Sequence, residues 1–230
     1  MKNTDGSEAA KRTAGESAAD LVSDGDLVGL GTGSTAAHAI RRLGDRVDSG
    51  LDVAGVATSY QSRELAREVG VPLESLADVS RIDVAIDGAD QVADGNLVKG
   101  GGAAHTREKV VDAAADRFVV VVDDSKVADV LSHPVPVEVL PDARATVAET
   151  VRDAGGDPEL RAAERKDGPV VTDNGNLVLD CDFGSVTEPA ALARRLSGIP
   201  GVLEHGLFVG LADELHVGDA DGGVATRSVR

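Results

Sequence analysis

Cysteine is almost absent from this sequence. Cys181 is the only one among 230 residues, which excludes a disulfide framework and a cysteine metal cluster. We expect Cys181 to be buried as a small hydrophobic residue. Long apolar runs are also missing, because the central run "FVVVV" at 118–122 is far shorter than the roughly 20 residues that cross a bilayer. The N-terminal segment is polar and acidic, unlike a signal peptide. We therefore expect a cytoplasmic protein with no membrane partner.

Basic clusters are lacking as well. The chain has 23 Lys and Arg residues against 40 Asp and Glu residues, a net charge of −17, and no basic stripe. A polyanion is bound by lysine and arginine clustered on one face, so we expect no nucleic-acid partner. An acidic surface suits a salt-rich cytoplasm, because screening shortens to roughly 3 Å at about 1 M salt. The charge therefore predicts a halophilic protein.

Lysine itself is scarce, since most cations in this chain are arginines. An ammonium group beside glycines suggests contact with an anion. Two of the lysines flank the stretch "KGGGAAHTREK", and a third ends "VVDDSK". The six lysines are Lys2, Lys11, Lys99, Lys109, Lys126 and Lys166.

The first half of the chain alternates valine-rich strands with helices. Apolar runs predict buried strands at 26–31, 51–57, 81–87 and 117–124. Apolar residues three and four apart predict helices at 34–47 and 62–70, the first opened by a serine cap. Strands separated by helices indicate an α/β fold with a doubly wound, mostly parallel, Rossmann-like sheet.

The second half follows a different order. Its pattern reads β-α-β-β-α-β, with a tight turn at Asn174-Gly175, and predicts a smaller, ferredoxin-like α+β domain. The final stretch returns to the first sheet. We therefore expect a Rossmann-like catalytic domain at 1–128 plus 206–230, and a ferredoxin-like domain at 129–205.

The motif "GLGTGSTA" at 29–36 follows a strand and opens a helix. The N–H groups of the helix start, the hydroxyls of Thr32, Ser34 and Thr35, and the bare backbone at Gly33 would accept a phosphate. The spacing is that of neither a dinucleotide fingerprint nor a P-loop. An ordinary helix cap is the alternative interpretation. "TSYQS" at 58–62 reads as a cap, with Ser59 a lesser candidate for phosphate contact.

The motif "DVAIDGAD" at 83–90 leaves two carboxylates, Asp87 and Asp90, after a strand. Ligands bind at the carboxyl ends of strands in open α/β sheets. Two carboxylates there can hold sugar hydroxyls or move protons between oxygens. A Mg²⁺ site and a plain turn are the alternatives, and no third acidic ligand lies at an obvious spacing.

The stretch 99–109 combines the parts of a proton-transfer site. Three glycines (Gly100, Gly101 and Gly102) offer backbone donors for an oxyanion, Lys99 adds positive charge, and Glu108 can act as a base. With a phosphate anchor, this set fits proton abstraction next to a carbonyl on a phosphorylated substrate, as in aldose–ketose isomerisation. A surface helix carboxylate is the alternative for Glu108.

Six segments in order resemble type A ribose-5-phosphate isomerases: "GLGTGSTA", "DGADQVADGNLVKGGGAAHTREKVV", "VVDDSK", "PVPVEV", "DNGNLVLD" and "IPGVLEHGLF". The resemblance runs from about residue 11 to the C-terminus. It implies interconversion of D-ribose 5-phosphate and D-ribulose 5-phosphate in the non-oxidative pentose phosphate pathway, without metal or organic cofactor, in a homodimer or homotetramer.

The resemblance also implies roles for residues. Glu108 would be the proton acceptor, with Asp87, Asp90 and Lys99 assisting, and Lys126 would be a further substrate contact. The residues implied to bind substrate are Thr32, Gly33, Ser34, Thr35, Asp87, Gly88, Ala89, Asp90, Lys99, Gly100, Gly101, Gly102 and Lys126. The loop between Asp90 and Lys99 is one residue shorter than in many bacterial members.

Two other functions share these features. One is a sugar-phosphate sensor module, although such regulators carry a basic DNA-binding helix-turn-helix and the segment before the first strand is short and acidic. The other is an isomerase of another phosphorylated sugar, which a panel of substrates would distinguish.

Overall fold

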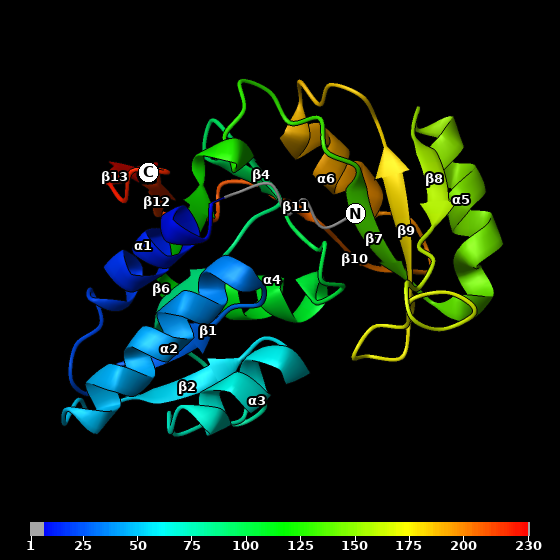
Figure 1. Ribbon diagram of the computed structural model, residues 1–230. Helices are drawn as coiled ribbons and strands as arrows, with labels where there is room; N and C mark the ends of the chain where they lie inside the picture. The colour runs from blue at the N-terminus through cyan, green and yellow to red at the C-terminus, as the bar shows by residue number, and fades with distance from the viewer. Residues whose placement is uncertain (1–6, 230) are drawn as a thin grey trace. The chain divides into compact units, whose positions relative to one another are not determined.

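The computed structural model describes residues 7–229, which form two compact units. Of the described residues, the α/β unit contains 7–89, Arg107–Val127 and 210–229. The α+β unit contains Asp90–Thr106 and Ala128–Val209 (Figure 1). Among residues 7–229, no helix is both long and apolar enough to cross a lipid bilayer.

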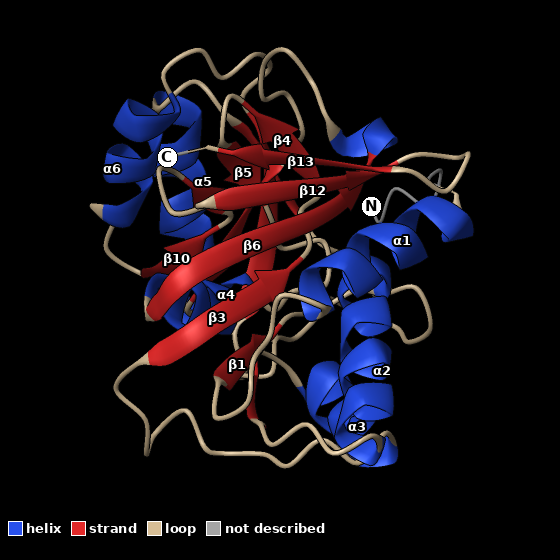
Figure 2. Cartoon of the chain, turned by 90° about the vertical axis from the view of Figure 1, so that its left-hand side faces the viewer, coloured by secondary structure: helices blue, strands red, loops and turns tan. Residues whose placement is uncertain are grey.

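The α/β unit is built on a six-stranded sheet with the strand order β13-β12-β6-β3-β1-β2. Figure 2 shows β12, β6, β3 and β1 side by side in this order. All neighbouring pairs are parallel except β12 and β13. The strands are β1 (Leu27–Leu30), β2 (Ala54–Ala57), β3 (Ile82–Asp87), β6 (Ala115–Asp123), β12 (Glu214–Gly218) and β13 (Val224–Ser228).

Helices cover both faces of this sheet. Val28 and Leu30 of β1 belong to a core cluster with buried residues of the first two helices. Gly29, between them, faces Val111 of the fourth helix, since a Cβ at Gly29 would lie 2.7 Å from Val111 Cγ1. Alternate residues of a strand point to opposite faces, so the sheet is doubly wound. The helices are α1 (Glu8–Ala19), α2 (Ser34–Asp48), α3 (Tyr60–Glu68) and α4 (His105–Ala113).

Small residues let α1 pack closely against its neighbours. A Cβ at Gly15 would lie 2.7 Å from Thr35 O in the first turn of α2. A Cβ at Gly218, the last residue of β12, would lie 2.0 Å from Ala10 O. Because both approaches exclude any larger side chain, α1 is fixed against α2 and against the carboxyl end of β12.

The α+β unit has a four-stranded antiparallel sheet in the order β10-β7-β9-β8. Its core is apolar and includes the inward side of β7 and the buried faces of two helices. Its elements are β7 (Val135–Val139), α5 (Arg144–Asp153), β8 (Asp157–Leu160), β9 (Leu177–Asp182), α6 (Pro189–Ser197) and β10 (Val202–His205). A smaller sheet in the same unit has the order β11-β5-β4. Its strands are β4 (Gln91–Ala93), β5 (Asn96–Val98) and β11 (Leu207–Phe208).

The predicted fold class is confirmed. The strands, the two helices of the first half and the β-α-β-β-α-β order of the second half all occur, and the C-terminal stretch returns to the larger sheet as β12. Three features were not predicted, namely α1, the β4–β5 hairpin and the last strand, β13. The division at 1–128 plus 206–230 and 129–205 stays a prediction, and the β4–β5 hairpin, inside the first of these domains, groups with the α+β unit.

Candidate active site

The carboxyl ends of the parallel strands gather most of the predicted residues of the α/β unit. The loop after β1 carries Thr32–Thr35, Asp87 ends β3, and Lys126 ends a short 3₁₀ helix (Asp124–Lys126) directly after β6. These strands are neighbours in one parallel sheet, so the three segments lie at the same edge. This edge is where open α/β sheets bind their ligands.

The loop after β1 is shaped for an anion. Gly33 precedes α2 with φ +112° and supplies no side-chain cap, so the N–H groups of the first turn of α2 are not capped by a side chain. The 15 residues of α2 direct their positive dipole end to this point. Backbone donors together with the hydroxyls of Ser34 and Thr35 are the groups that bind phosphate at helix starts.

Hydroxyl groups from two loops meet beside this turn. Thr32 Oγ1 donates to Ser59 Oγ at 2.7 Å and lies 2.8 Å from Thr58 Oγ1. Ser59 also caps α3 by accepting from the N–H of Ser62 at 3.2 Å. The predicted cap is therefore confirmed, and Ser59 additionally fixes the side chain of Thr32, a contact that the sequence did not predict.

Asp87 ties the loop after β1 to the end of β3. Its Oδ1 accepts from the N–H of Thr32 at 3.0 Å and from the N–H of Gly88 at 2.7 Å. Its side chain is fully buried. A Cβ at Gly31 would lie 2.2 Å from that oxygen, so only glycine lets the carboxylate come this close.

Glu108 lies in the first turn of α4 and is 4% exposed. It is three residues before Val111, which packs on Gly29 of the sheet, so both side chains share one face of the helix. Because β6 begins at Ala115, just after α4 ends, the last turn of α4 lies at the amino end of the sheet. Its first turn, with Glu108, therefore points toward the carboxyl edge.

A further lysine lies near this edge. Lys11 of α1 is 5% exposed, and its Nζ pairs with Glu8 Oε1 at 3.1 Å. It follows Ala10, which packs on the carboxyl end of β12 beside β6. Lys126 is 8% exposed. The scarcity of lysine in the sequence was the signal that could have singled out Lys11.

In the α+β unit, the β4–β5 hairpin brings Asp90 next to the glycine run. A two-residue turn at Asp94 and Gly95, both with positive φ, joins the two strands of this hairpin. The N–H of Asp90 donates to Val98 O at 2.8 Å. Asp90 Oδ2 then accepts from the N–H of Gly101 at 2.7 Å. One of the three predicted oxyanion donors is thus bonded to the second predicted carboxylate.

Lys99 is held on both sides within the same unit. Its N–H donates to Gly206 O at 2.8 Å, and its Nζ lies 5.3 Å from the centre of the Phe208 ring. It is 2% exposed, so its charge is largely removed from water. A cation over an aromatic face is attracted by the ring quadrupole, so the Phe208 ring is a favourable neighbour for this ammonium group.

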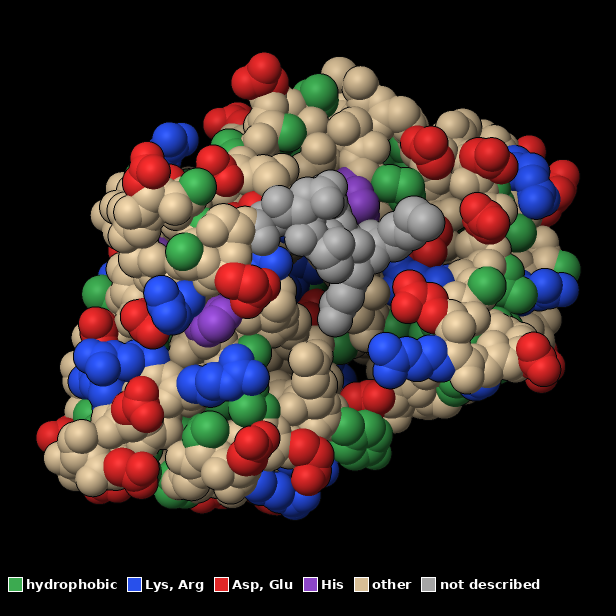
Figure 3. Space-filling view, viewed as in Figure 1, with side chains coloured by type: hydrophobic (Ala, Val, Ile, Leu, Met, Phe, Trp, Pro, Cys, Tyr) green, Lys and Arg blue, Asp and Glu red, His purple; other side chains and the backbone are tan. Residues whose placement is uncertain are grey.

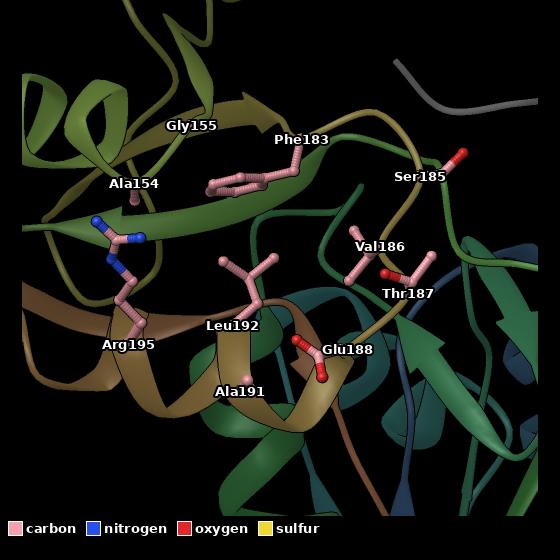
Figure 4. Close-up of a pocket in the computed structure, with 10 residues that line it drawn as sticks. All are labelled: Ala154, Gly155, Phe183, Ser185, Val186, Thr187, Glu188, Ala191, Leu192 and Arg195. Atoms are coloured by element: carbon pink, nitrogen blue, oxygen red, sulfur yellow. The ribbon is translucent and has the colours of Figure 1, made fainter.

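A cavity of about 280 Å³ lies elsewhere in the α+β unit (Figure 4). The side chains of Phe183 and Leu192 point toward one another across it, with Arg195 at one end and Glu188 at the other. It contains none of the predicted site residues. Among residues 7–229, no three His, Cys, Asp or Glu side chains are grouped as metal ligands.

Acidic side chains are spread over the face in Figure 3, with lysines and arginines interspersed among them. The isolated thiol of Cys181 is fully buried in the α+β core, as predicted. Its burial, together with the negative charges of Asp180 and Asp157, raises its pKa to about 12. This thiol therefore stays protonated near neutral pH.

A family model for ribose 5-phosphate isomerase A (phosphoriboisomerase A) matches residues 54–222. The chain belongs to this family. The ribose-5-phosphate isomerase A of the haloarchaeon Haloarcula marismortui is 70% identical over 94% of this chain and 95% of its own length. That of Methanosarcina acetivorans is 55% identical over 97% of this chain and 96% of its own length.

Solved structures of ribose-5-phosphate isomerases share the fold. One in complex with phospho-erythronic acid matches with a TM-score of 0.92 and 43% identity, over 95% of this chain and 97% of that chain. The isomerase A from Methanocaldococcus jannaschii matches with a TM-score of 0.91 and 42% identity, over the same shares. The segments that resemble the family in sequence are thus carried by the fold of the family.

Proposed function

We propose that this member of the ribose 5-phosphate isomerase A family interconverts D-ribose 5-phosphate and D-ribulose 5-phosphate through a cis-enediol(ate), in the non-oxidative pentose phosphate pathway. The observation that carries the proposal is the buried carboxylate of Glu108, directed toward the sheet edge that holds the start of α2. A base and a phosphate anchor on one edge are what proton abstraction from a phosphorylated sugar requires.

The anchor is the loop after β1. The N–H groups at the start of α2 and the hydroxyls of Ser34 and Thr35 bind the phosphate, and Gly33 allows it to approach the backbone. Lys126 adds a positive charge at this edge. The hydroxyl of Thr32 is oriented by Ser59 and completes the set.

The chemistry takes place at C1 and C2 of the open sugar. Asp87 or Asp90 assists ring opening, and Glu108 removes the proton from C2. The C1 oxygen of the resulting enediolate takes up a proton as the hydroxyl on C2 gives one up. Glu108 returns its proton to C1, which leaves a carbonyl at C2. No atom is gained or lost in this sequence.

The negative charge of the enediolate needs donors at the other reactive end. We assign this role to Lys99, whose side chain is buried, and to N–H groups of the glycine run. Because the N–H of Gly101 already bonds to Asp90, we assign this contact to its neighbour Gly102. Phospho-erythronic acid, bound by a relative of 43% identity, supports an enediolate intermediate because it pairs a phosphate with a carboxylate that resembles an enediolate.

The test follows D-ribose 5-phosphate in buffered D₂O with molar KCl and EDTA. We expect D-ribulose 5-phosphate to form, with solvent deuterium at carbon, because the proton passes through an exchangeable base. Glu108→Gln should lower kcat by about 10²- to 10⁴-fold, whereas Glu149→Gln, on the exposed face of α5, should leave it unchanged. Near-normal turnover by Glu108→Gln would show that another group is the base. If the protein converted a different phosphorylated sugar and not D-ribose 5-phosphate, the proposed substrate would be wrong.

We propose that the protein is a cytoplasmic homodimer or homotetramer, as the sequence resemblance implies. Size-exclusion chromatography with light scattering in molar KCl measures the mass of the assembly against the 23.4 kDa chain. A peak at the mass of one chain would contradict it.

A further inference from the structure

Arg161 contacts the glycine run from a distant part of the sequence. It directly follows β8, and its side chain is 12% exposed. Its Nη1 donates to Gly100 O at 2.8 Å and to Gly101 O at 3.3 Å. Its Nε donates to Asp180 Oδ2 at 2.8 Å, and its Nη2 donates to Asp180 Oδ1. One guanidinium thus joins a carboxylate of β9 to two carbonyls of the glycine run, all within the α+β unit.

These bonds fix a peptide that would otherwise rotate freely. The carbonyl of the peptide between Gly100 and Gly101 accepts from Arg161, and its N–H donates to Asp90. The same carbonyl also accepts from the N–H of Ala103 at 2.9 Å. Glycine has the largest choice of backbone conformations, and Gly100 has φ +111°. Rotation of this peptide would break bonds on both of its sides.

The next peptide is oriented by the same guanidinium. In a trans peptide, the carbonyl and the N–H point in opposite directions. Because Gly101 O points toward Arg161, the N–H of Gly102 points away from Arg161. The direction of this donor is therefore set by a side chain that lies on the other side of the glycine run.

We propose that Arg161 is a positioning residue for the isomerisation. It holds the glycine run so that the N–H of Gly102 is directed to the enediolate, and it fixes Asp90 through Gly101. Asp180 keeps the guanidinium in place by a two-point contact. Arg161 acts on backbone atoms and not on the sugar, and its role rests on the proposed function.

Arginine is suited to this position and lysine is not. A guanidinium has five N–H donors in a rigid plane, so it can contact a carboxylate and two carbonyls in fixed directions. The ammonium of lysine is a single point on a flexible chain. Arg161→Lys keeps the charge beside Asp180 but cannot bond to the carboxylate and to both carbonyls at once.

The experiment compares Arg161→Lys and Asp180→Asn with the parent protein, using Arg152→Lys as the matched control. Arg152 lies on α5 of the same unit. Its side chain is 52% exposed and forms an ion pair with Glu149, one turn earlier on the same helix. Steady-state kinetics with D-ribose 5-phosphate give kcat and KM. Inhibition by phospho-erythronic acid reports the reacting end, and inhibition by inorganic phosphate reports the phosphate end.

For Arg161→Lys, we expect kcat and the affinity for phospho-erythronic acid to fall together by about 10- to 100-fold, because displaced donors no longer meet the charge. The inhibition constant of inorganic phosphate should stay within about twofold, since the anchor is at α2. Asp180→Asn should show the same pattern with a smaller loss. If Arg161 were only structural, its substitution would lower the folded fraction. The kcat of the folded protein and its inhibition constants for phospho-erythronic acid and inorganic phosphate would stay unchanged.

Two outcomes would overturn the proposal. The first is a folded Arg161→Lys whose kcat and phospho-erythronic acid affinity match those of Arg152→Lys. The second, decisive if Arg161→Lys does not fold, is an Asp180→Asn with unchanged constants. An inactive parent protein would instead contradict the proposed function itself, so the two failures are distinguishable.

Discussion

Asp87 Oδ1 lies 3.0 Å from the backbone nitrogen of Thr32 and accepts its hydrogen bond. The same kind of bond occurs at the other end of these two strands, where Asp83 Oδ2 accepts from the N–H of Leu27 at 2.8 Å. Strands β1 and β3 are thus joined by an aspartate at each end. Only the first of these aspartates lies at the edge proposed to bind substrate.

This pair separates stability from activity. Asp87→Asn should lower the free energy of unfolding by about 1–2 kcal/mol, because a charged acceptor is replaced by a neutral one. It should also lower kcat by about 10-fold or more, since proton transfer at the sugar is lost. Asp83→Asn should cost similar stability and leave kcat unchanged. Urea unfolding and steady-state kinetics measure both, and equal kcat values for the two variants would contradict the role of Asp87.

Glu138 should make stability depend on pH. Its side chain is buried in β7. Burial favours the neutral acid, but hydrogen bonds from Thr106, Asn176, Thr172 and Asn174 outweigh it and lower the pKa of Glu138. A carboxyl whose pKa is lower in the folded state stabilises the fold above its unfolded pKa of about 4.3. That contribution is lost as pH falls below this value toward the folded pKa.

Glu138→Gln tests this dependence by urea unfolding between neutral and acid pH at fixed KCl. The substitution should cost about 1–3 kcal/mol at pH 7, because several buried donors lose a charged acceptor. The difference from the parent should shrink as pH falls below about 4.3. Glu149→Gln, on an exposed helix face, is the control and should change neither the free energy of unfolding nor its dependence on pH. A constant difference at every pH would mean that the Glu138 carboxyl does not titrate with folding.

Cys181 should be unreactive until the protein unfolds. Because its pKa is about 12, almost none of the thiol is ionised near neutral pH, and its complete burial keeps reagents away from the sulfur. With a disulfide reagent at pH 8, we expect the native protein to be labelled only at the rate at which it unfolds. In denaturant, one equivalent of reagent should react at once. Rapid stoichiometric labelling of the native protein would show that the α+β core opens readily.

Salt should raise the melting temperature. The net charge of −17 makes the compact state repel itself, and screening shortens from about 10 Å at 0.1 M to about 3 Å at 1 M salt. We expect melting to move upward between dilute and molar KCl. A neutral osmolyte at matched osmolality separates screening from solvent exclusion. An unchanged melting temperature in KCl would contradict the halophilic interpretation.

The sequence predicts most of the fold because valine runs and turn residues mark the strands directly. It did not predict α1, whose buried face consists mainly of alanines such as Ala10, Ala14 and Ala18 and gives little contrast with its polar face. The sequence predicts a loop where the β4–β5 hairpin lies, although Asp94-Gly95 is a strong turn signal. Three-residue strands are too short to show an alternating pattern.

The candidate residues could be named from sequence, but their partners could not. Asp90 and Gly101 become neighbours only through the register of a hairpin, and Arg161 is 60 residues from Gly101. Such distant hydrogen bonds leave no local pattern in the sequence. Ser59 was predicted as a cap, and its bond to Thr32 depends on where β1 and β2 end in the sheet.

The α/β unit is interrupted in the chain, and this has a consequence during synthesis on the ribosome. Strands β1, β2, β3 and β6 emerge first, whereas β12, the neighbour of β6, emerges only after residues 128–209. The valine-rich edge of β6 is therefore unpaired while most of the α+β unit is being translated. An open apolar strand edge favours aggregation. The nascent chain should depend on chaperones most strongly in this interval, and least once residues 214–218 have left the exit tunnel.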